Sequence, residues 1–354
     1  MQSTHQLYCA DSRHMEPIAD NSVDLVVTSP PYPMISMWDK QFASFAPEID
    51  AALRRGDGVA AWEAMHRQLD RVWAECSRVV KPGGFICVNI GDATRTVDGD
   101  FRLYSNHSRI ISAFHTLGLV QLPAVLWRKA TNSPTKFMGS GMLPAGAYVT
   151  LEHEYVLIFR NGGRRQFKTE SARANRRRSG LWWEERNRWY SDVWEFKGSR
   201  QGLSGADIGF DGAAARERSA AFPFELAYRL IHMYSVQTDV VLDPFAGTGT
   251  TLTAAMAGAR NSIGIELEES FVEQARRRLL GLKMELNSCS RDRLQRHKLF
   301  IEDYRTRKGA PKHYNEFYRY PVVTSQETDI RLPFIADVYS REKHITAEHT
   351  WKME

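Results

Sequence analysis

Apolar and polar positions follow two different periods along the first 160 residues. Short β-branched runs, such as Val23 to Val27, predict buried strands, whereas longer segments repeat apolar residues every three or four positions, as amphipathic helices do. Lys81-Pro82-Gly83-Gly84 ends the first long helix. This alternation of strand and helix predicts a mostly parallel sheet with helices on both faces. The predicted strands cover 23–27, 85–90, 119–127 and 154–159, and the predicted helices cover 60–79 and 105–117.

The regular pattern stops after Arg160 and returns at Pro223. Residues 160–200 are basic and aromatic, and residues 198–212 hold five glycines, which predicts a mobile loop. The last segment, 285–354, is charged and aromatic without an interpretable period, and the chain contains no internal repeat. The elements predicted between these segments are helices at 224–235, 249–257 and 268–281 and strands at 240–242 and 262–265.

Length and composition set the class of protein. A chain of 354 residues suits one large α/β domain with insertions or two smaller domains. No apolar run approaches the ~18 residues that a membrane helix needs, and the first residues lack the apolar core of a signal peptide, so we expect a cytoplasmic protein. None of the four cysteines forms a CxxC pair, which argues against a zinc site and a disulfide framework.

Positive charge is concentrated in one segment. Residues 160–200 carry twelve Lys and Arg against five acids, an excess of +7, whereas the whole chain carries +5. Such a concentration suggests a polyanionic partner, although charge runs also form solvated faces. Residues 182–194 hold four of the nine tryptophans, which could form a small core. We favour a mixed arrangement, in which some tryptophans pack the segment and arginines contact the partner.

A glycine loop follows the strand at 240–242, in the sequence VVLDPFAGTGTT. Gly247-x-Gly249 before a helix lets backbone N–H groups approach a ligand. A P-loop would need a lysine after the last glycine, and a dinucleotide site would need a third glycine, and both are absent. S-adenosylmethionine (SAM) is the third option, because Glu266 ends the next strand and can accept hydrogen bonds from two ribose hydroxyls. A tight turn without a ligand remains the alternative.

A proline-rich loop, Thr28 to Tyr32, follows the first buried strand. It lies at the carboxyl edge of the predicted sheet, where open α/β sheets bind ligands. The two prolines fix the backbone, so the Ser29 hydroxyl, the Pro30 carbonyl and the Tyr32 ring can act together. Two oxygens that accept hydrogens and one ring that stacks suit a planar amine. The alternative is a proline-rich turn with an exposed tyrosine.

Together, TSPPY at 28–32 and DPFAGTGTT at 243–251 resemble the DNA amino-methyltransferases, which transfer a methyl group from SAM to an exocyclic base nitrogen. The catalytic motif precedes the SAM loop and a basic segment lies between them, which resembles the β class of that family. The resemblance covers about 5–283. It implies a Rossmann-like SAM-dependent methyltransferase fold, with a mostly parallel seven-stranded sheet whose last strand is reversed, helices on both faces and a small target-recognition region.

The resemblance also implies a division of the chain. The expected segments are a catalytic half at 1–159, a DNA-binding target-recognition region at 160–215, a SAM-binding half at 216–284 and a C-terminal extension of unknown role at 285–354. Residues 153–159 resemble a strand near the target base. In the basic segment, the arginines expected to contact DNA are Arg164, Arg165, Arg176, Arg177, Arg178, Arg186 and Arg188.

The site residues implied by the resemblance form two sets, and no metal is expected. Asp11 matches the residue that contacts the adenine of SAM, and Phe222 opens the segment that walls the methionine half. The expected SAM-binding residues are Asp11, Phe222, Asp243, Phe245, Gly247, Gly249, Thr250 and Glu266. The expected catalytic residues are Ser29, Pro30, Pro31 and Tyr32.

The first residue of the prolyl motif carries information about the target base. In this family Ser at that position usually accompanies cytosine N4, and Asp or Asn accompanies adenine N6. Methylation of cytosine C5 needs a cysteine nucleophile, usually after proline, and no cysteine here follows a proline. Ser29 therefore favours a DNA cytosine-N4 methyltransferase that acts on a flipped-out base in double-stranded DNA.

Three alternatives stay open: adenine N6 as the target, an RNA substrate, and a SAM- or DNA-binding protein without activity. A cognate restriction endonuclease and a second copy of the chain are candidate partners, no membrane partner is expected, and the expected location is the prokaryotic cytoplasm in association with DNA.

Overall fold

The computed structural model describes residues 1–129, 139–196, 222–341 and 344–352, so the predicted glycine-rich loop at 198–212 lies outside the described residues. A ten-stranded sheet has the order β13-β14-β1-β10-β9-β2-β3-β7-β6-β8. From β1 to β3 the neighbours are parallel, and β7 runs antiparallel to both β3 and β6. These seven strands form the predicted methyltransferase sheet with its reversed strand. Antiparallel β14 and β13 widen it beside β1, and β8 widens it beside β6.

The strands agree with the apolar runs of the sequence. All six residues of β2 are buried, as expected for a strand covered on both faces. Strand β3 begins at Val80, so Lys81-Pro82-Gly83-Gly84 lies inside the strand that follows the helix. The strands of the large sheet are β1 Gln2–Cys9, β2 Val23–Thr28, β3 Val80–Ile90, β6 Val120–Arg128, β7 His153–Arg160, β8 Val193–Glu195, β9 Val240–Asp243, β10 Asn261–Glu266, β13 Phe334–Arg341 and β14 His344–Thr350. Two small hairpins pair β4 Ala93–Val97 with β5 Asp100–Tyr104 and β11 His313–Asn315 with β12 Tyr320–Val322.

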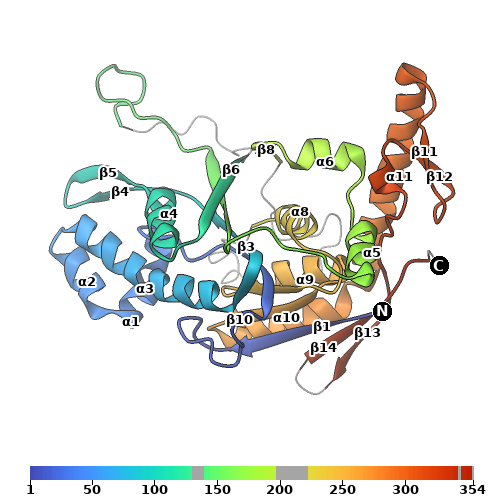
Figure 1. Cartoon of the computed structure of the whole chain (residues 1–354). Coiled ribbons are helices and arrows are strands. Elements are labelled where there is room, and N and C mark those ends of the chain that lie inside the picture. The colour runs from blue at the N-terminus through green and yellow to red at the C-terminus, as the bar shows by residue number, and fades with distance from the viewer. Residues whose placement is uncertain (130–138, 197–221, 342–343, 353–354) are drawn as a thin grey trace.

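Helices cover both faces of the sheet, as predicted, and each face has its own apolar core. In Figure 1, α1 to α4 gather at the left, and α8 to α10 lie at the centre and right. The first group packs on Val26 and Val88, and the second packs on Leu25 and Val27. The helices are η1 Ser36–Trp38, α1 Asp39–Phe45, α2 Pro47–Arg54, α3 Gly58–Val79, α4 Asn106–Thr116, α5 Glu170–Arg178, α6 Trp183–Trp189, α8 Phe224–Tyr234, α9 Thr250–Ala257, α10 Glu269–Gly281, α11 Lys283–Lys308 and η2 Ser325–Glu327.

The C-terminal segment has regular structure that the sequence did not reveal. Helix α11 rises at the right of Figure 1, beside the β11–β12 hairpin. Its Leu294 shares a small core with Trp182 of the basic segment and with Ile330. The buried Arg293 guanidinium forms a bidentate ion pair with Glu185 of α6, with both N–O distances at 2.7 Å. Residues 182–189 and the C-terminal extension therefore pack as one unit.

The tryptophans of the basic segment take part in packing, as we expected for some of them. Trp182, Trp189 and Trp194 are buried, whereas Trp183 is only partly buried and stacks on Phe300 of α11. The tryptophans therefore pack the segment against the rest of the protein. Among the helices that the structure describes, none has both the length and the apolar character to cross a bilayer.

Candidate active site

The prolyl loop and the glycine loop open into one pocket, at the carboxyl ends of β1, β2, β9 and β10. The pocket is lined by every residue of the two predicted sets except Gly249 and Tyr32. Two motifs more than 200 positions apart in sequence thus share one cavity. The predicted residues that line it are Asp11, Ser29, Pro30, Pro31, Phe222, Asp243, Phe245, Gly247, Thr250 and Glu266.

The two glycines of the loop have different tasks. Both have a positive φ, 50° at Gly247 and 80° at Gly249, which other residues rarely adopt. No atom lies within 4 Å of a Cβ added at Gly247, whereas a Cβ at Gly249 would lie 2.9 Å from the Ala275 Cβ. Gly249 therefore lets α10 pack against the start of α9, and Gly247 turns the chain at the pocket wall.

Glu266 holds the glycine loop through backbone N–H groups. Its Oε2 accepts from Gly247 N at 2.9 Å, and its Oε1 accepts from Leu267 N and Glu268 N at 2.8 and 3.0 Å. Because Glu266 already accepts from the Gly247 N–H, that N–H cannot serve a phosphate, as it would in a P-loop. Burial raises the pKa of the Glu266 carboxyl above its ordinary value.

Asp243 joins the two motifs. Thr28 Oγ1 donates to Asp243 Oδ1 at 2.7 Å, and Thr251 Oγ1 donates to Oδ2 at 2.6 Å. The Asp243 carboxyl therefore ties the end of β2, just before Ser29, to the start of α9. Burial raises its pKa to about 6, although these hydroxyl hydrogen bonds oppose the shift.

The charge of the pocket fits SAM. Among the described residues its lining holds the carboxylates of Asp11, Asp243, Glu266 and Glu268, but only one cation, Arg13. Arg13 is already paired with Asp11 at 2.6 Å. Burial raises the pKa of Asp11, but the hydrogen bonds and charge of Arg13 outweigh burial and lower it. A net negative pocket suits a cationic sulfonium and repels phosphates. The walls also contain aromatic rings that can stack on a purine, among them Phe222, Phe245 and Phe271.

Tyr32 is not among the residues that line the pocket, and its hydroxyl belongs to a partly buried hydrogen-bond network. Its hydroxyl accepts from Ser29 Oγ at 3.2 Å and from Asn89 Nδ2 at 2.9 Å, and donates to Glu154 Oε2 at 3.0 Å. Lys129 Nζ donates to the other oxygen of Glu154. Burial, followed by the nearby charge of Glu154, raises the pKa of Tyr32 well above 10, so its hydroxyl stays protonated at neutral pH.

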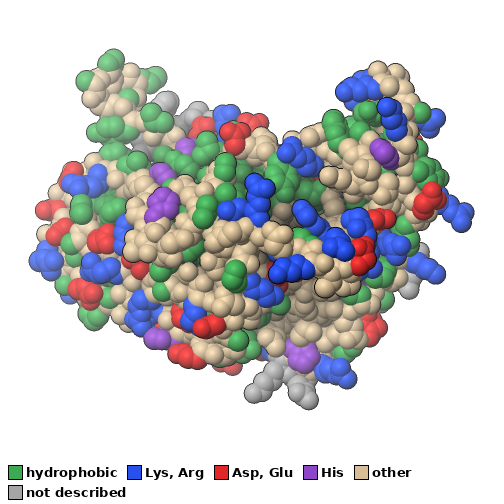
Figure 2. All heavy atoms as spheres, viewed as in Figure 1, with side chains coloured by type: hydrophobic (Ala, Val, Ile, Leu, Met, Phe, Trp, Pro, Cys, Tyr) green, Lys and Arg blue, Asp and Glu red, His purple; other side chains and the backbone are tan. Residues whose placement is uncertain are grey.

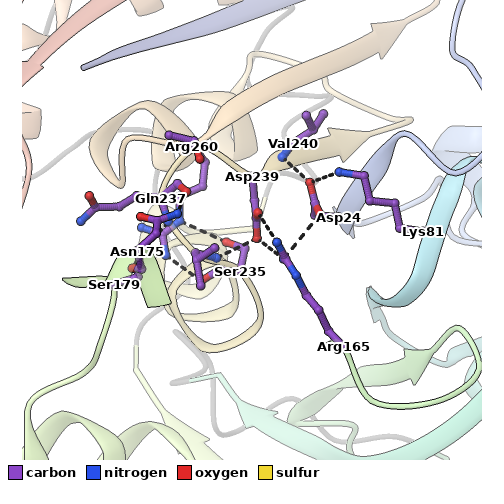
Figure 3. A network of polar contacts seen from close by, with 12 residues as sticks. Asp24, Lys81, Arg165, Asn175, Ser179, Ser235, Gln237, Asp239, Val240 and Arg260 are labelled. Carbon is purple, nitrogen blue, oxygen red and sulfur yellow. Dashed lines mark hydrogen bonds and ion pairs between the residues drawn. The ribbon is translucent and has the colours of Figure 1, made fainter. Parts of the chain in front are cut away.

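Arg165, predicted to contact DNA, lies at the opposite end of the sheet. Its guanidinium binds both oxygens of Asp239, at 2.6 and 2.9 Å, and approaches Asp24 at 3.4 Å (Figure 3). Asp24 also accepts from Lys81 Nζ at 2.7 Å. Asp24 and Lys81 lie near the starts of β2 and β3, so this network anchors the basic segment to the amino ends of the strands.

The α5 arginines also face partners within the protein. Arg176 lies over the Phe167 ring, Arg177 pairs with Glu170 and Asp329, and Arg178 lies over the Trp351 ring. The helix is fastened near the same anchor by Asn175 Nδ2, which donates to Gln237 O at 2.7 Å (Figure 3).

The α6 arginines have a different position. Arg186 and Arg188 are both exposed, on a helix that leads to β8. Strand β8 pairs with β6 at Leu126–Arg128, directly before Lys129. Figure 2 shows the molecule hollowed on its upper side, between the loop that precedes β7 and α11, with Lys and Arg side chains spread across the face below. Arg164 is also exposed.

Sequence reasoning missed Arg13, Phe271, Asn89, Lys129 and Glu154. Asn89 and Glu154 could have been found, because the first lies one residue before the end of one predicted strand and the second begins another at the same edge of the sheet. Lys129 lies two residues after the end of a predicted strand and directly after β6. Arg13 and Phe271 follow no motif, and their place in the pocket depends on tertiary packing.

Comparisons with known proteins agree with this fold and pocket. The family model N6_N4_Mtase, described as DNA methylase, matches residues 23–277. The Type II methyltransferase M.MthZI of Methanothermobacter thermautotrophicus is 49% identical over 334 residues, which cover 94% of this chain and 91% of that protein. M.MjaI of Methanocaldococcus jannaschii is 45% identical over 280 residues, covering 76% of this chain and 89% of that protein.

Solved structures show the same architecture. A protein of Thermus thermophilus, assigned as a DNA modification methylase and solved with SAM, has a TM-score of 0.58 and 31% identity, over 78% of this chain and 93% of its own. The cytosine-N4-specific PvuII DNA methyltransferase has a TM-score of 0.50 and 17% identity, over 83% of this chain and 93% of its own, which shows the fold alone.

The fold and pocket therefore define a SAM-dependent methyltransferase. More particularly, the chain belongs to the N6_N4_Mtase family of DNA methylases, whose members methylate amino groups of bases. The family, the fold class and the SAM cofactor predicted from the two motifs are thus confirmed.

Proposed function

We propose that this protein methylates N4 of cytosine in double-stranded DNA. The observation that supports this most is the neutral hydroxyl of Ser29, which lines the SAM pocket beside the Pro30 carbonyl. SAM supplies an activated methyl group on a sulfonium, so the chain's main task is to position the acceptor nitrogen.

Ser29 and Pro30 would act on the target amino group. The amino nitrogen of cytosine is a weak nucleophile, because its lone pair is delocalised into the ring. The Ser29 Oγ and the Pro30 carbonyl can each accept one amino hydrogen, which favours a more tetrahedral nitrogen with a localised lone pair. Asp243 supports this geometry, because it fixes Thr28 directly before the loop.

The base has to leave the duplex to reach this site, because a stacked base cannot enter a pocket at a sheet edge. We propose that the Tyr32 ring stacks on the flipped base. DNA would lie across the hollow of Figure 2, with the exposed Arg186 and Arg188 at its phosphates. In this proposal Arg165 holds the segment in place and does not contact DNA, because its guanidinium is bound to Asp239.

The test is the identity of the product. We would incubate the protein with SAM and DNA of mixed sequence, digest the DNA and measure the methylated nucleosides by mass spectrometry. N4-methylcytosine is the expected product. Ser29→Ala is the matched control variant, because it removes only the Ser29 hydroxyl on which the proposal rests. N6-methyladenine as the sole product would overturn the cytosine assignment while leaving the family unchanged.

We further propose that the methylation protects DNA from a cognate restriction endonuclease, because both archaeal relatives are named Type II methyltransferases. DNA methylated by this protein should then resist an endonuclease of the same recognition sequence. Sedimentation with and without DNA would show whether a second copy of the chain joins the complex.

A further inference from the structure

The hydroxyl of Tyr32 uses all of its hydrogen-bonding capacity. A phenol has one hydrogen to donate and room to accept two. Ser29 and Asn89 fill the two acceptor positions, and Glu154 takes the hydrogen. The direction of each bond is therefore fixed by the groups around the oxygen.

Glu154 determines these directions. Its side chain is buried, with 8% of the residue exposed, and an ionised carboxylate can only accept hydrogen bonds. Asn89 Nδ2 lies 2.6 Å from Glu154 Oε2, so the amide of Asn89 has to turn its NH₂ group toward this carboxylate. The Tyr32 hydrogen must also point at Glu154, since Asn89 offers the tyrosine only a donor.

This arrangement settles the direction of the hydrogen bond at Ser29. With its own hydrogen on Glu154, the Tyr32 oxygen can only accept from Ser29 Oγ. The Ser29 hydrogen is then committed away from the pocket, and the lone pairs of Ser29 Oγ are left for a donor in the pocket. An amino group is such a donor.

We propose that Glu154 is a positioning residue for methyl transfer: acting through the Tyr32 hydroxyl, it makes Ser29 Oγ an obligatory acceptor for the hydrogen of the target amino group. This inference rests on the proposed role of Ser29 and holds for either base, cytosine or adenine. Lys129 supports Glu154 by binding its second oxygen, which balances the buried charge.

Glu154→Gln should release this direction while changing few atoms. Lys129 can only donate, so it holds the new amide oxygen, and the new NH₂ group faces Tyr32. Asn89 then turns its amide oxygen toward this NH₂ group, and the Tyr32 hydroxyl accepts from Gln and can donate to Asn89 or to Ser29. The direction at Ser29 is therefore no longer fixed, and the Ser29 hydrogen is free to point at the substrate. Where it does so one preorganised hydrogen bond is lost, so the single-turnover methylation rate should fall, by at most about 10²–10³-fold.

Two further variants separate this role from a general structural one. Tyr32→Phe removes the hydroxyl through which Glu154 acts, so E154Q/Y32F should be as fast as Y32F alone. Lys129→Met lets the amide of E154Q turn its oxygen toward Tyr32 and Asn89, so K129M/E154Q should recover to within about tenfold of the wild type. The K129M/E154Q variant also removes both charges of this ion pair, so neither charge is left without its partner.

The measurements are single-turnover transfer of labelled methyl groups to DNA, SAM affinity by calorimetry and thermal unfolding. Glu152→Gln is the control. Glu152 lies two residues before Glu154 and pairs with Arg128, so E152Q removes the same charge without touching the Tyr32 network. We expect E152Q to keep the wild-type rate and E154Q to keep the wild-type SAM affinity.

Failure of this inference is distinguishable from failure of the proposed function. Glu154 does not set the direction at Ser29 if wild type methylates DNA and E154Q is equally fast. The same conclusion follows if adding Y32F or K129M to E154Q lowers the methylation rate further. If wild type produces no amino-methylated base, the proposed function itself is wrong.

Discussion

Carboxylates lie at both ends of the same parallel strands, but the groups that bind them differ between the two ends. At the amino ends, Asp24 and Asp239 are paired with Lys81 and Arg165, and the charges cancel. At the carboxyl ends, Asp243 is held by hydroxyls and a backbone N–H, and Glu266 by backbone N–H groups. Among the described residues, neither Asp243 nor Glu266 forms an ion pair.

This difference separates an anchor from a binding site. At the amino ends, the paired charges hold one segment against another and satisfy each other. Carboxylates fixed only by neutral donors keep their negative charge available, although burial makes that charge costly. The end of the sheet that carries Asp243 and Glu266 is the end where a cationic cofactor gains most.

The largest effect is expected at the anchor. Arg165→Ala leaves Asp239 and Asp24 without this guanidinium, and removing one partner of a buried pair costs about 3–5 kcal/mol. Since Arg165 is 34% exposed, we expect the lower end of this range, about 3 kcal/mol of unfolding free energy. Urea denaturation measures the loss. SAM affinity of the folded variant should stay at the wild-type value, and a weakened affinity would contradict the separation of the two ends.

The second prediction concerns pH at the carboxyl end. Burial raises the pKa of Asp243 to about 6 in the folded protein, from 3.8. Between these two values the folded state binds a proton that the unfolded state has released, so the contribution of Asp243 to stability falls as pH rises from about 4 to 6. The whole change is about 3 kcal/mol.

Other carboxylates change stability in the opposite direction, so the measurement needs a control. The pKa values of Glu63 and Glu75 are lowered, mainly by hydrogen bonds from Arg109 and Arg78, and these pairs lose stability at low pH. Asp243→Asn keeps the Thr28 and Thr251 contacts but cannot titrate. The stability difference between wild type and D243N should therefore change between pH 4 and 7, and a constant difference would show an ordinary pKa at Asp243.

Much of this carboxyl end could be predicted from the sequence, because two rigid loops carry it. TSPPY and DPFAGTGTT each follow a buried strand, and the strand ends alone bring both to one edge of the sheet. The link between them through Asp243 and Thr28 was not predictable, since both are common strand-end residues and their contact depends on the strand order.

The C-terminal unit could not be predicted, because its buried surface is half polar. On α11 the buried positions follow helical spacing, but Asn287, Ser290, Arg293 and His297 lie among them. A search for apolar periodicity therefore fails there. The partner of Arg293 is Glu185, 108 positions away, and nothing local indicates that this arginine is buried.

The third prediction tests the carboxyl end directly. Glu266→Gln removes the charge and turns one acceptor into a donor, so SAM affinity should fall by about 1.5–3 kcal/mol, the range for a charged hydrogen bond. Calorimetry measures the affinity, and Glu269→Gln is the control, because Glu269 is exposed in the first turn of α10 outside the pocket. Unchanged affinity in E266Q would remove Glu266 from the SAM site.

The smallest effect is expected for DNA binding. Here the two ends of the sheet are compared through the arginines that lie near each of them. Arg186 and Arg188 lie on α6, which leads to the active-site end of β6, whereas Arg176 and Arg177 lie on α5 beside the anchor. If α6 contacts two phosphates, R186Q/R188Q should reduce the slope of log K against log salt by about 1.8, because fewer counterions are released. The affinity loss should be about 1 kcal/mol, as for exposed charge pairs.

The control is R176Q/R177Q. It removes the same charge and should change the slope less, because Arg177 already pairs with Glu170 and Asp329. An equal change in both double variants would place DNA along the whole basic segment, and a change in α5 alone would move the DNA to the anchored end of the sheet.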